Sequence, residues 1–448
     1  MAVDSAVIDL HPADIPRKRR LERFLVGISA TFLLVNFLAL SLVKNDGDIL
    51  HWVRFGIWFL CAAGGSLLLE RYLPGRDPLL FPIALFLSGW GLLMIDRLAP
   101  NFADRQTIWL VVSMAAMLIV ALLPGPLRWL RSYRYILLVF GLLLLLATIV
   151  LGRNPSDPLG ETNAPQLWLG IGNVFFQPSE ALKIILVAFL ASYLAENYPA
   201  MRSERLDSGG RILPFSPRVL GPILLMWGIS VMILVWQRDL GTAILFFVVF
   251  LVLLYLASGY SLILVSGAIL ILIAALVAYR EFDVVRLRVD IWLNPWPEAD
   301  GRAFQIVQSL LAFAAGGIFG QGVGQGSPTY IPVVHSDFVF AALAEEWGLV
   351  GVITVVVCIA ILVTRGMRAA VRQQRRPFLA LLTVGLSMLI ATQSLLIMAG
   401  VLKLVPLTGV TLPFLSYGGS SLLASFVIIG LLLRLSALET DDAVHPRN

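Results

Sequence analysis

The chain has 448 residues, of which 58% are hydrophobic and only 14% are charged, and its mean hydropathy is +0.87. A soluble domain averages about 45–50% apolar and about 25% charged residues, so a water-soluble fold is excluded. The net charge of +5 does not indicate nucleic acid binding, because the charges lie in short loops between long apolar runs, where they set membrane orientation.

The first apolar run, residues 24–43, follows a polar segment that ends in a cluster of Arg and Lys. It is about 20 residues long, enough to span a bilayer, and it lacks a small-residue cleavage motif. It is therefore predicted to be a retained span rather than a signal peptide. Eleven further runs of spanning length follow, at 50–70, 79–97, 107–124, 135–152, 181–195, 219–236, 239–258, 261–279, 338–364, 379–402 and 419–437. Hydrocarbon leaves no water to satisfy backbone groups, so each run should be a helix, which predicts an all-α polytopic membrane protein of about twelve spans.

Charge sets the predicted orientation. Arg residues concentrate in alternate loops, at 125–134, 196–218 and 365–378, whereas the short loop 45–49 carries two Asp. Basic loops stay on the cytoplasmic side, so both termini, including a tail at 438–448, are predicted to be cytoplasmic in a multi-pass protein of the cytoplasmic (inner) membrane. Two longer loops, 153–180 and 280–337, then lie on the outer face.

Ionisable side chains at membrane depth are costly, so they indicate function. Glu180 and Lys183 are spaced i,i+3 at the start of an apolar run, which places both on one helix face as an ion pair. The pair either lines a site or only anchors the helix end. Gln237 and Asp239 lie in a tight polar turn between two later runs, a pattern that an ordinary solvated turn would explain equally well.

The large outer loop holds most of the remaining candidates. Arg286 and Arg288 suit recognition of a diphosphate. The carboxylates Glu298 and Asp300, set among Trp and Pro, are candidates for general-base work. A Gly-rich run at 316–326 would let backbone approach a ligand closely, and it lacks the Lys-Ser/Thr ending of a nucleotide-binding P-loop. Further polar candidates in this loop are Gln305, Gln308, Ser309 and His335.

The last candidates precede the final span. Lys403, Ser416 and Tyr417 lie in a stretch dense in Pro and Gly, residues 403–421. Such a stretch predicts a broken or re-entrant segment, because irregular backbone at membrane depth needs protein or a wet cavity around it. A plain interfacial loop is the alternative. From these residues alone, a transporter and a lipid-processing enzyme both stay open.

Six motifs in this order resemble the SEDS family, the RodA/FtsW proteins of cell elongation, division and sporulation. The motifs are QPSEALK at 177–183, QRDLGT at 237–242, NPWPEADGRAFQIVQS at 294–309, GGIFGQGVGQG at 316–326, HSDFVFAALAEEWG at 335–348 and PLTGVTLPFLSYGGSS at 406–421. The resemblance covers about residues 79–437 and implies a ten-span core, to which residues 1–78 add two extra N-terminal spans.

The resemblance implies a peptidoglycan glycosyltransferase that polymerises lipid II, an undecaprenyl-diphosphate-linked disaccharide-peptide, on the outer face of the membrane. A carboxylate of the large outer loop would act as general base in a single, inverting displacement. The family implies a class B penicillin-binding protein as partner; it allows a divalent cation, with metal ligands unassigned, and requires no other cofactor. Residues that would line or shape the cavity are Glu180, Lys183, Asp239 and Lys403.

A lipid II flippase and a non-catalytic division scaffold are the alternatives. A flippase needs charged groups strung through the membrane centre, whereas the ionisable clusters here concentrate at the outer ends of helices. That distribution favours chemistry on the outer face. The role in elongation, division or sporulation stays open.

The chain departs from the family pattern at three places. The family's usual Asp in the Asn-Pro segment corresponds without a gap to Glu298, whereas Asp300 lies two residues on, so both are kept as candidate bases. Arg238 replaces the usual Pro of the second motif. Residues 165–168 replace an Ala-Arg-Arg-Trp sequence, which removes two expected cations from that loop.

Overall fold

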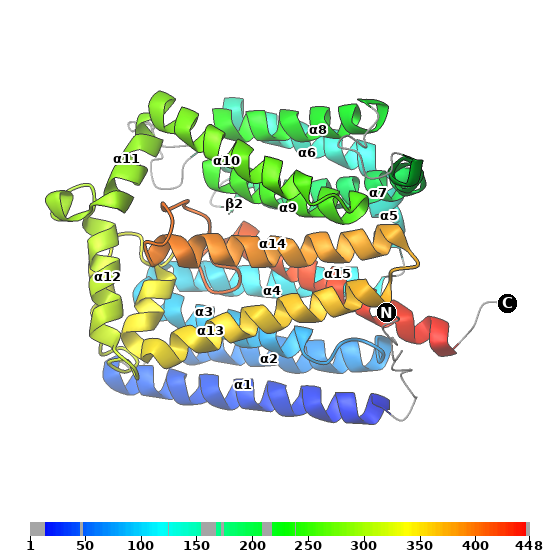
Figure 1. Ribbon diagram of the computed structural model, residues 1–448. Helices are drawn as coiled ribbons and strands as arrows, with labels where there is room; N and C mark the ends of the chain where they lie inside the picture. The colour runs from blue at the N-terminus through cyan, green and yellow to red at the C-terminus, as the bar shows by residue number, and fades with distance from the viewer. Residues whose placement is uncertain are drawn as a thin grey trace.

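The structure, a computed structural model, describes residues 14–44, 48–123, 125–153, 167–171, 174–207, 217–237 and 239–444. Every predicted span coincides with a helix, and these helices lie side by side in one bundle (Figure 1). They are α1 (Asp14–Lys44), α2 (Ile49–Tyr72), α3 (Leu80–Leu98), α4 (Pro100–Leu122), α6 (Arg134–Leu151), α7 (Pro178–Asp207), α8 (Pro217–Trp236), α9 (Leu240–Ser258), α10 (Leu262–Glu281), α13 (Val339–Arg372), α14 (Pro377–Val401) and α15 (Gly419–Val444).

The all-α membrane fold is confirmed. Among the described residues, 11 helices are long and apolar enough to cross a membrane, and in α8 the apolar stretch found is the shorter Trp227–Trp236. α1 begins and α15 ends at the same end of the bundle, as an even number of crossings requires (Figure 1).

Several helices extend beyond the apolar runs that predicted them, so the predicted loops are partly wrong. α4 begins at Pro100, seven residues early, while α7 continues to Asp207 and α13 to Arg372. The predicted loop 125–134 contains the short helix α5 (Pro126–Ser132). The reason is physical: apolarity marks the hydrocarbon layer, but Arg, Glu and Ala are good helix formers, and each added residue gains a backbone hydrogen bond.

The two longer loops carry most of the minor elements. The described part of 153–180 forms an antiparallel pair, β1 (Leu169–Ile171) and β2 (Val174–Phe176). The large outer loop folds into α11 (Asp283–Leu293), η1 (Trp296–Glu298), α12 (Phe304–Gly316) and η2 (Pro328–Tyr330). In Figure 1, α11 and α12 run across one end of the bundle, so this loop is ordered.

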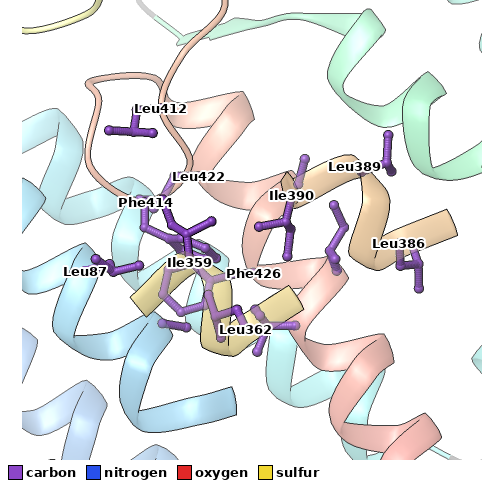
Figure 2. Packing of buried hydrophobic residues seen from close by; sticks show 14 of the residues in the cluster. Leu87, Ile359, Leu362, Leu386, Leu389, Ile390, Leu412, Phe414, Leu422 and Phe426 are labelled. Atoms are coloured by element: carbon purple, nitrogen blue, oxygen red, sulfur yellow. The ribbon is translucent and has the colours of Figure 1, made fainter. Parts of the chain in front are cut away.

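The core lies between α3, α4, α7, α13, α14 and α15. In the apolar windows of α3, α7 and α14, 78–83% of residues are buried, whereas in α10 only 6% are. Figure 2 shows Leu87 of α3, Ile359 of α13 and Phe426 of α15 gathered in this core, with Leu386 of α14 farther along the same cluster. α7, which begins with the first motif, is therefore central, and α10 presents its apolar surface outward, where lipid would cover it.

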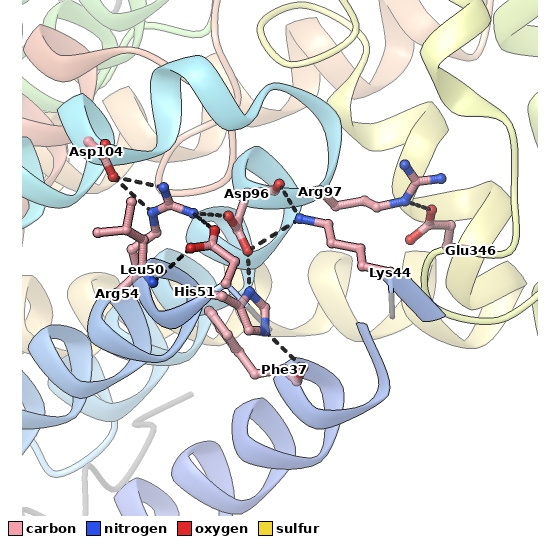
Figure 3. A network of polar contacts seen from close by, with 10 residues as sticks. Phe37, Lys44, Leu50, His51, Arg54, Asp96, Arg97, Asp104 and Glu346 are labelled. Atoms are coloured by element: carbon pink, nitrogen blue, oxygen red, sulfur yellow. Dashed lines mark hydrogen bonds and ion pairs between the residues drawn. The ribbon is translucent and has the colours of Figure 1, made fainter. Parts of the chain in front are cut away.

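The two N-terminal helices pack onto the bundle rather than standing apart. Leu33, Phe37 and Trp58 are at most 1% exposed, and Leu33 and Trp58 fill the space beside Gly89 of α3. A polar group joins this hairpin to α3 and α4 (Figure 3). This hairpin network consists of Lys44, His51, Arg54, Asp96 and Asp104.

Candidate functional site

The first motif begins α7 and places a charged pair inside the protein. Pro178 opens the helix, where its missing N–H costs nothing. Lys183 is only 2% exposed, forms an ion pair with Glu180, and donates a hydrogen bond of 2.8 Å to Gln393 Oε1 on α14. The predicted ion pair is confirmed. Because the ammonium group is buried and bonded to another helix, the pair does more than anchor a helix end.

The second motif begins α9 and also points inward. Asp239 caps the helix by accepting a hydrogen bond of 3.2 Å from the Thr242 backbone N–H. Its other oxygen, Oδ2, is buried without a hydrogen-bond partner, and this burial raises the pKa of the carboxyl. Gln237 serves the structure instead, donating to Leu145 O at 2.7 Å and Thr148 Oγ1 at 2.6 Å. Arg238 lies outside the described residues.

Arg288 of α11 lies within electrostatic range of two carboxylates. It acts electrostatically on both Asp239 and Asp337, and it donates a hydrogen bond of 3.4 Å to Thr408 O. Asp337 accepts a hydrogen bond of 2.7 Å from the Ser336 hydroxyl. Burial raises the pKa of Asp337, and the nearby Arg288 charge only partly opposes it. A Cβ on Gly409 would lie 3.9 Å from both Arg288 Nη2 and Asp337 Oδ2, so the loop before α15 closes over this pair.

These contacts define the outer cluster: Glu180, Lys183, Asp239, Arg288 and Asp337. Glu180 joins it because its charge acts on Asp239. The cluster draws on α7, α9, α11 and the segment before α13, and it lies at the end of the bundle opposite the termini (Figure 1). Two cations and three carboxylates thus share one partly buried region, a suitable setting for binding and reacting a charged substrate.

The two predicted bases lie elsewhere. Glu298 and Asp300 belong to the turn between α11 and α12, which projects beyond the bundle in Figure 1. The Glu298 side chain is 43% exposed and pairs with Arg302 at 2.8 Å, and this cation lowers its pKa. Asp300 is exposed. No contact among the described residues joins either carboxylate to the outer cluster.

The two predicted phosphate-binding arginines also separate. Arg288 enters the outer cluster, whereas Arg286 is exposed, donates to Arg280 O at 2.8 Å and faces Asp283 at 3.6 Å. On α12, Ser309 is buried and donates to Val401 O at 3.2 Å, while Gln305 and Gln308 are partly buried. Ser309 therefore ties α12 to α14 rather than lining the cluster.

The segment before α15 is irregular backbone inside the protein, as predicted. Leu412, Phe414 and Leu415 in it are at most 2% exposed. Ser416 Oγ donates to Ser336 O at 2.6 Å, next to Asp337. Tyr417 N donates to the backbone carbonyl of His335 at 2.8 Å. These bonds hold the outer loop to this segment.

His335 and Lys403 support the same packing. The His335 ring lies 5.0 Å from the Phe102 ring and 5.7 Å from the Tyr417 ring, and burial lowers its pKa. Lys403 has φ of +59°, and its carbonyl accepts a hydrogen bond of 3.1 Å from Trp292 Nε1 of α11. Both residues position the segments that carry Asp337 and Arg288.

At Gly316 and Gly320 the Gly-rich run packs closely against the backbone of α13, while its approach to a ligand stays a prediction. α13 breaks at Gly348, whose φ is +64°. The run fills the break: Gln321 N donates to Glu345 O at 2.9 Å, and Gly322 N donates to Glu346 O at 3.0 Å. At Gly320, with φ of +83°, a Cβ would lie 2.2 Å from Glu346 O, so only glycine fits.

Comparison with known proteins identifies the family. The sequence model of the FtsW/RodA/SpoVE proteins, described as "Cell cycle protein", matches residues 87–441. The chain belongs to the FtsW/RodA/SpoVE family. This match begins within α3 and includes every part of the outer cluster.

Among similar members is the peptidoglycan glycosyltransferase RodA of Mycobacterium tuberculosis (strain ATCC 25618 / H37Rv), 37% identical over 434 residues that cover 94% of this chain and 91% of the relative. A probable peptidoglycan glycosyltransferase FtsW of Geobacter metallireducens is 34% identical over 337 residues, 75% of this chain and 84% of that protein. A match over 94% of the chain has to include part of residues 1–78, so the similarity to this relative extends into the N-terminal segment.

Solved family structures share the fold. A chain from a peptidoglycan synthase complex that coordinates polymerization and crosslinking superposes with a TM-score of 0.66 at 28% identity, covering 82% of this chain and 99% of that one. The crystal structure of Thermus thermophilus RodA gives a TM-score of 0.57 at 25% identity, covering 82% and 97%.

Sequence reasoning about this FtsW/RodA/SpoVE member missed several residues that complete the site. Asp337 stood in a recognised motif but was not chosen, because nothing local showed that Arg288 would face it. Gln393 lies in an apolar run, where a buried amide was the available signal. Outside the outer cluster, Arg97 at the edge of a predicted span ties α3 to α13 and the Gly-rich run, because it pairs with Glu346 at 3.2 Å and donates to Gly326 O at 3.0 Å.

Proposed function

We propose that this chain is a peptidoglycan glycosyltransferase that polymerises lipid II on the outer face of the cytoplasmic membrane. Its family relatives carry that enzyme name. The observation that carries the proposal is the outer cluster, in which Lys183 and Arg288 lie beside three carboxylates at one end of the bundle. A transporter would need such groups along the membrane centre, whereas these residues begin helices or lie in the outer loop.

The reaction assigns distinct roles to cations and carboxylates. The 4-hydroxyl oxygen of one lipid-linked sugar attacks the anomeric carbon of another, forming a C–O bond. The bond from that carbon to the undecaprenyl diphosphate breaks, and the anomeric centre inverts. The diphosphate leaves as an anion, so it requires positive charge rather than a proton, which Arg288 and Lys183 would supply. The hydroxyl loses its proton to a general base.

The general base comes from the turn between α11 and α12. Glu298 occupies the family's position without a gap, but its pairing with Arg302 makes it a weaker base. Asp300, two positions after Glu298, is an Asp like the residue usual in the family. For either to act, bound substrate would have to extend from the outer cluster to this turn.

A divalent cation fits the outer cluster only as a companion of the substrate. Among the described residues, no group of three or more His, Cys, Asp or Glu comes together as a metal site. Mg²⁺, however, often binds through one or two carboxylates plus substrate phosphates. Asp239, with its unpartnered Oδ2, and Asp337 fit that mode. When bound, the cation would add positive charge beside the leaving diphosphate, so chelation with EDTA should abolish polymerisation without unfolding the protein.

The proposed partner is a class B penicillin-binding protein, a single-span transpeptidase. The similarity to a chain of a peptidoglycan synthase complex supports this proposal. Glycan strands made here would then pass directly to a crosslinking enzyme.

The test is lipid II polymerisation by the purified full-length protein, alone and with a cognate transpeptidase. Glu298→Gln and Asp300→Asn are compared with Asp290→Asn, an exposed outer-loop Asp that accepts a hydrogen bond from Tyr279. Loss of a general base slows a reaction about 10²–10⁴-fold. A loss in one variant, with Asp290→Asn active, identifies the base. Full activity in both variants would remove the turn from the mechanism, and an inactive wild type with its partner would refute the enzyme.

A further inference from the structure

A cavity of about 440 Å³ opens at the end of the bundle that carries both chain termini, far from the outer cluster (Figure 1). α5, the start of α14 and the end of α15 supply most of its wall. Arg128, Arg131, Arg376 and Arg434 line it, together with apolar side chains that include Leu127 and Phe378. We call it the basic cavity. Its volume lies in the range of about 300–1,000 Å³ that is typical of small-molecule sites.

The chemistry of the basic cavity selects an anion. None of its described lining residues is acidic. α14 adds further positive potential, because its first turn, with Pro377 at the first position, forms part of the wall. The N-terminus of a 25-residue helix carries unpaired N–H groups and the positive end of the helix dipole.

The basic cavity is also partly apolar, which distinguishes it from a site for a free ion. The Arg131 guanidinium lies 5.5 Å from the centre of the Phe378 ring, so the cation is held against an apolar wall. Leu127, Leu379 and Leu438 continue that wall. A ligand that fills the cavity should therefore carry negative charge at one end and hydrocarbon at the other.

We propose that the basic cavity binds the phosphate headgroup of an anionic membrane phospholipid, with its acyl chains continuing along the bundle surface. Basic pockets between membrane helices on the cytoplasmic side are suited to such headgroups. The positive-inside distribution of Arg predicts that this end faces the cytoplasm, where anionic lipids create a negative surface. The proposal is independent of the reaction proposed for the outer face.

Binding here would act on the core directly. α14 starts in the basic cavity, and its Gln393 holds Lys183 of the outer cluster. A headgroup that joins α5 to the ends of α14 and α15 would therefore order the helix on which that contact depends.

The experiment is native mass spectrometry of the delipidated full-length protein, mixed with phosphatidylglycerol, cardiolipin, phosphatidylcholine or undecaprenyl diphosphate. The test variant replaces Arg128, Arg131 and Arg434 with Gln. The control replaces Arg17, Arg20 and Arg71 with Gln; these residues lie at the same end of the bundle but outside the cavity, and the charge change is identical. A third variant carries Lys at the three cavity positions and keeps the charge.

We expect wild type, the control and the Lys variant to retain phosphatidylglycerol or cardiolipin at least about tenfold better than phosphatidylcholine, and the Gln variant to lose that preference. Equal retention by the Gln variant would overturn the site. Displacement of the lipid by inorganic phosphate would show that the basic cavity is a free-anion site. Stronger retention of undecaprenyl diphosphate would assign the cavity to the substrate lipid. Either result would overturn the proposal that it binds a phospholipid headgroup. If the Gln variant unfolds at a lower temperature than wild type, its loss of binding could reflect misfolding, and the Lys variant becomes the test. It keeps the positive charge, so loss of lipid binding by the Lys variant would contradict the proposal.

Discussion

Two buried polar groups at the same end of the bundle differ in how completely they are bonded. In the hairpin network, Asp96 is fully buried, yet one of its oxygens contacts His51 and the other contacts Arg54 (Figure 3). His51 is bonded in turn to Phe37 O at 2.9 Å. In the outer cluster, by contrast, Asp239 Oδ2 is buried without a hydrogen bond.

The difference separates structure from function. A buried group whose hydrogen bonds are all made by the protein has no capacity left for a ligand, and removing one partner leaves an uncompensated charge. An unpartnered buried oxygen costs stability and is retained where a substrate or ion completes it. By burial and charge alone, the hairpin network and the outer cluster would both be candidate functional sites. The unused hydrogen-bonding capacity of the outer cluster distinguishes the two.

The largest effect expected is on activity in the outer cluster. Asp239→Asn and Asp337→Asn should each lower lipid II polymerisation about 10²–10³-fold, the range for losing one preorganised electrostatic group. Thermal stability should not fall, because a neutral amide is cheaper to bury than a carboxylate. Polymerisation assays and melting curves of the same preparations check both parts. A variant that is active but unstable would place these residues with the hairpin network instead.

The hairpin network should respond in the opposite way. Asp96→Ala leaves His51 and Arg54 buried beside an empty position, so we expect a loss of about 3–5 kcal/mol of unfolding free energy. Activity per folded molecule should stay near that of wild type at low temperature. Denaturant titration in detergent measures the unfolding free energy, and polymerisation normalised to folded protein measures the activity per folded molecule. Activity lost from a protein of unchanged stability would make the network catalytic.

A smaller effect concerns the exposed turn and the acidic limb of the pH–rate profile. Arg302 lowers the pKa of Glu298. A general base at Glu298 would therefore stay ionised at pH values below the ordinary Glu pKa of about 4.3. Arg302→Gln should then move the acidic limb to higher pH. Burial raises the pKa of Asp337 above the ordinary Asp value of about 3.9, so a limb that does not move in Arg302→Gln points to the outer cluster. The limb of kcat, measured for wild type and variant, decides between the two.

The smallest effect is expected at the rim of the hairpin network. Asp104 bonds Arg54 at 2.8 Å, but its side chain is 63% exposed, so water replaces it readily. Asp104→Asn should cost less than about 1 kcal/mol, as exposed ion pairs do. It is the matched control for Asp96→Ala in the denaturant titration. Equal losses at the two positions would show that burial does not set the strength of this network.

The sequence by itself determined the membrane class, the order of the spans and the family, because each depends on local composition or on short motifs. It also determined the Glu180–Lys183 pair, since residues three apart on a helix share a face. Helix ends were less well determined, because apolarity reports the hydrocarbon layer and not where helical hydrogen bonding stops.

Only the tertiary structure decided which distant residues meet. Lys183 reaches Gln393, 210 positions away, and three separate segments bring Arg288 near the charges of Asp239 and Asp337. It also decided that Glu298 is half-exposed and paired with Arg302, that Asp300 is exposed, and that Gly320 fits against a broken helix. Such contacts depend on how whole helices pack, and packing is settled by shape and burial across the bundle rather than by the residues next to each position in the chain.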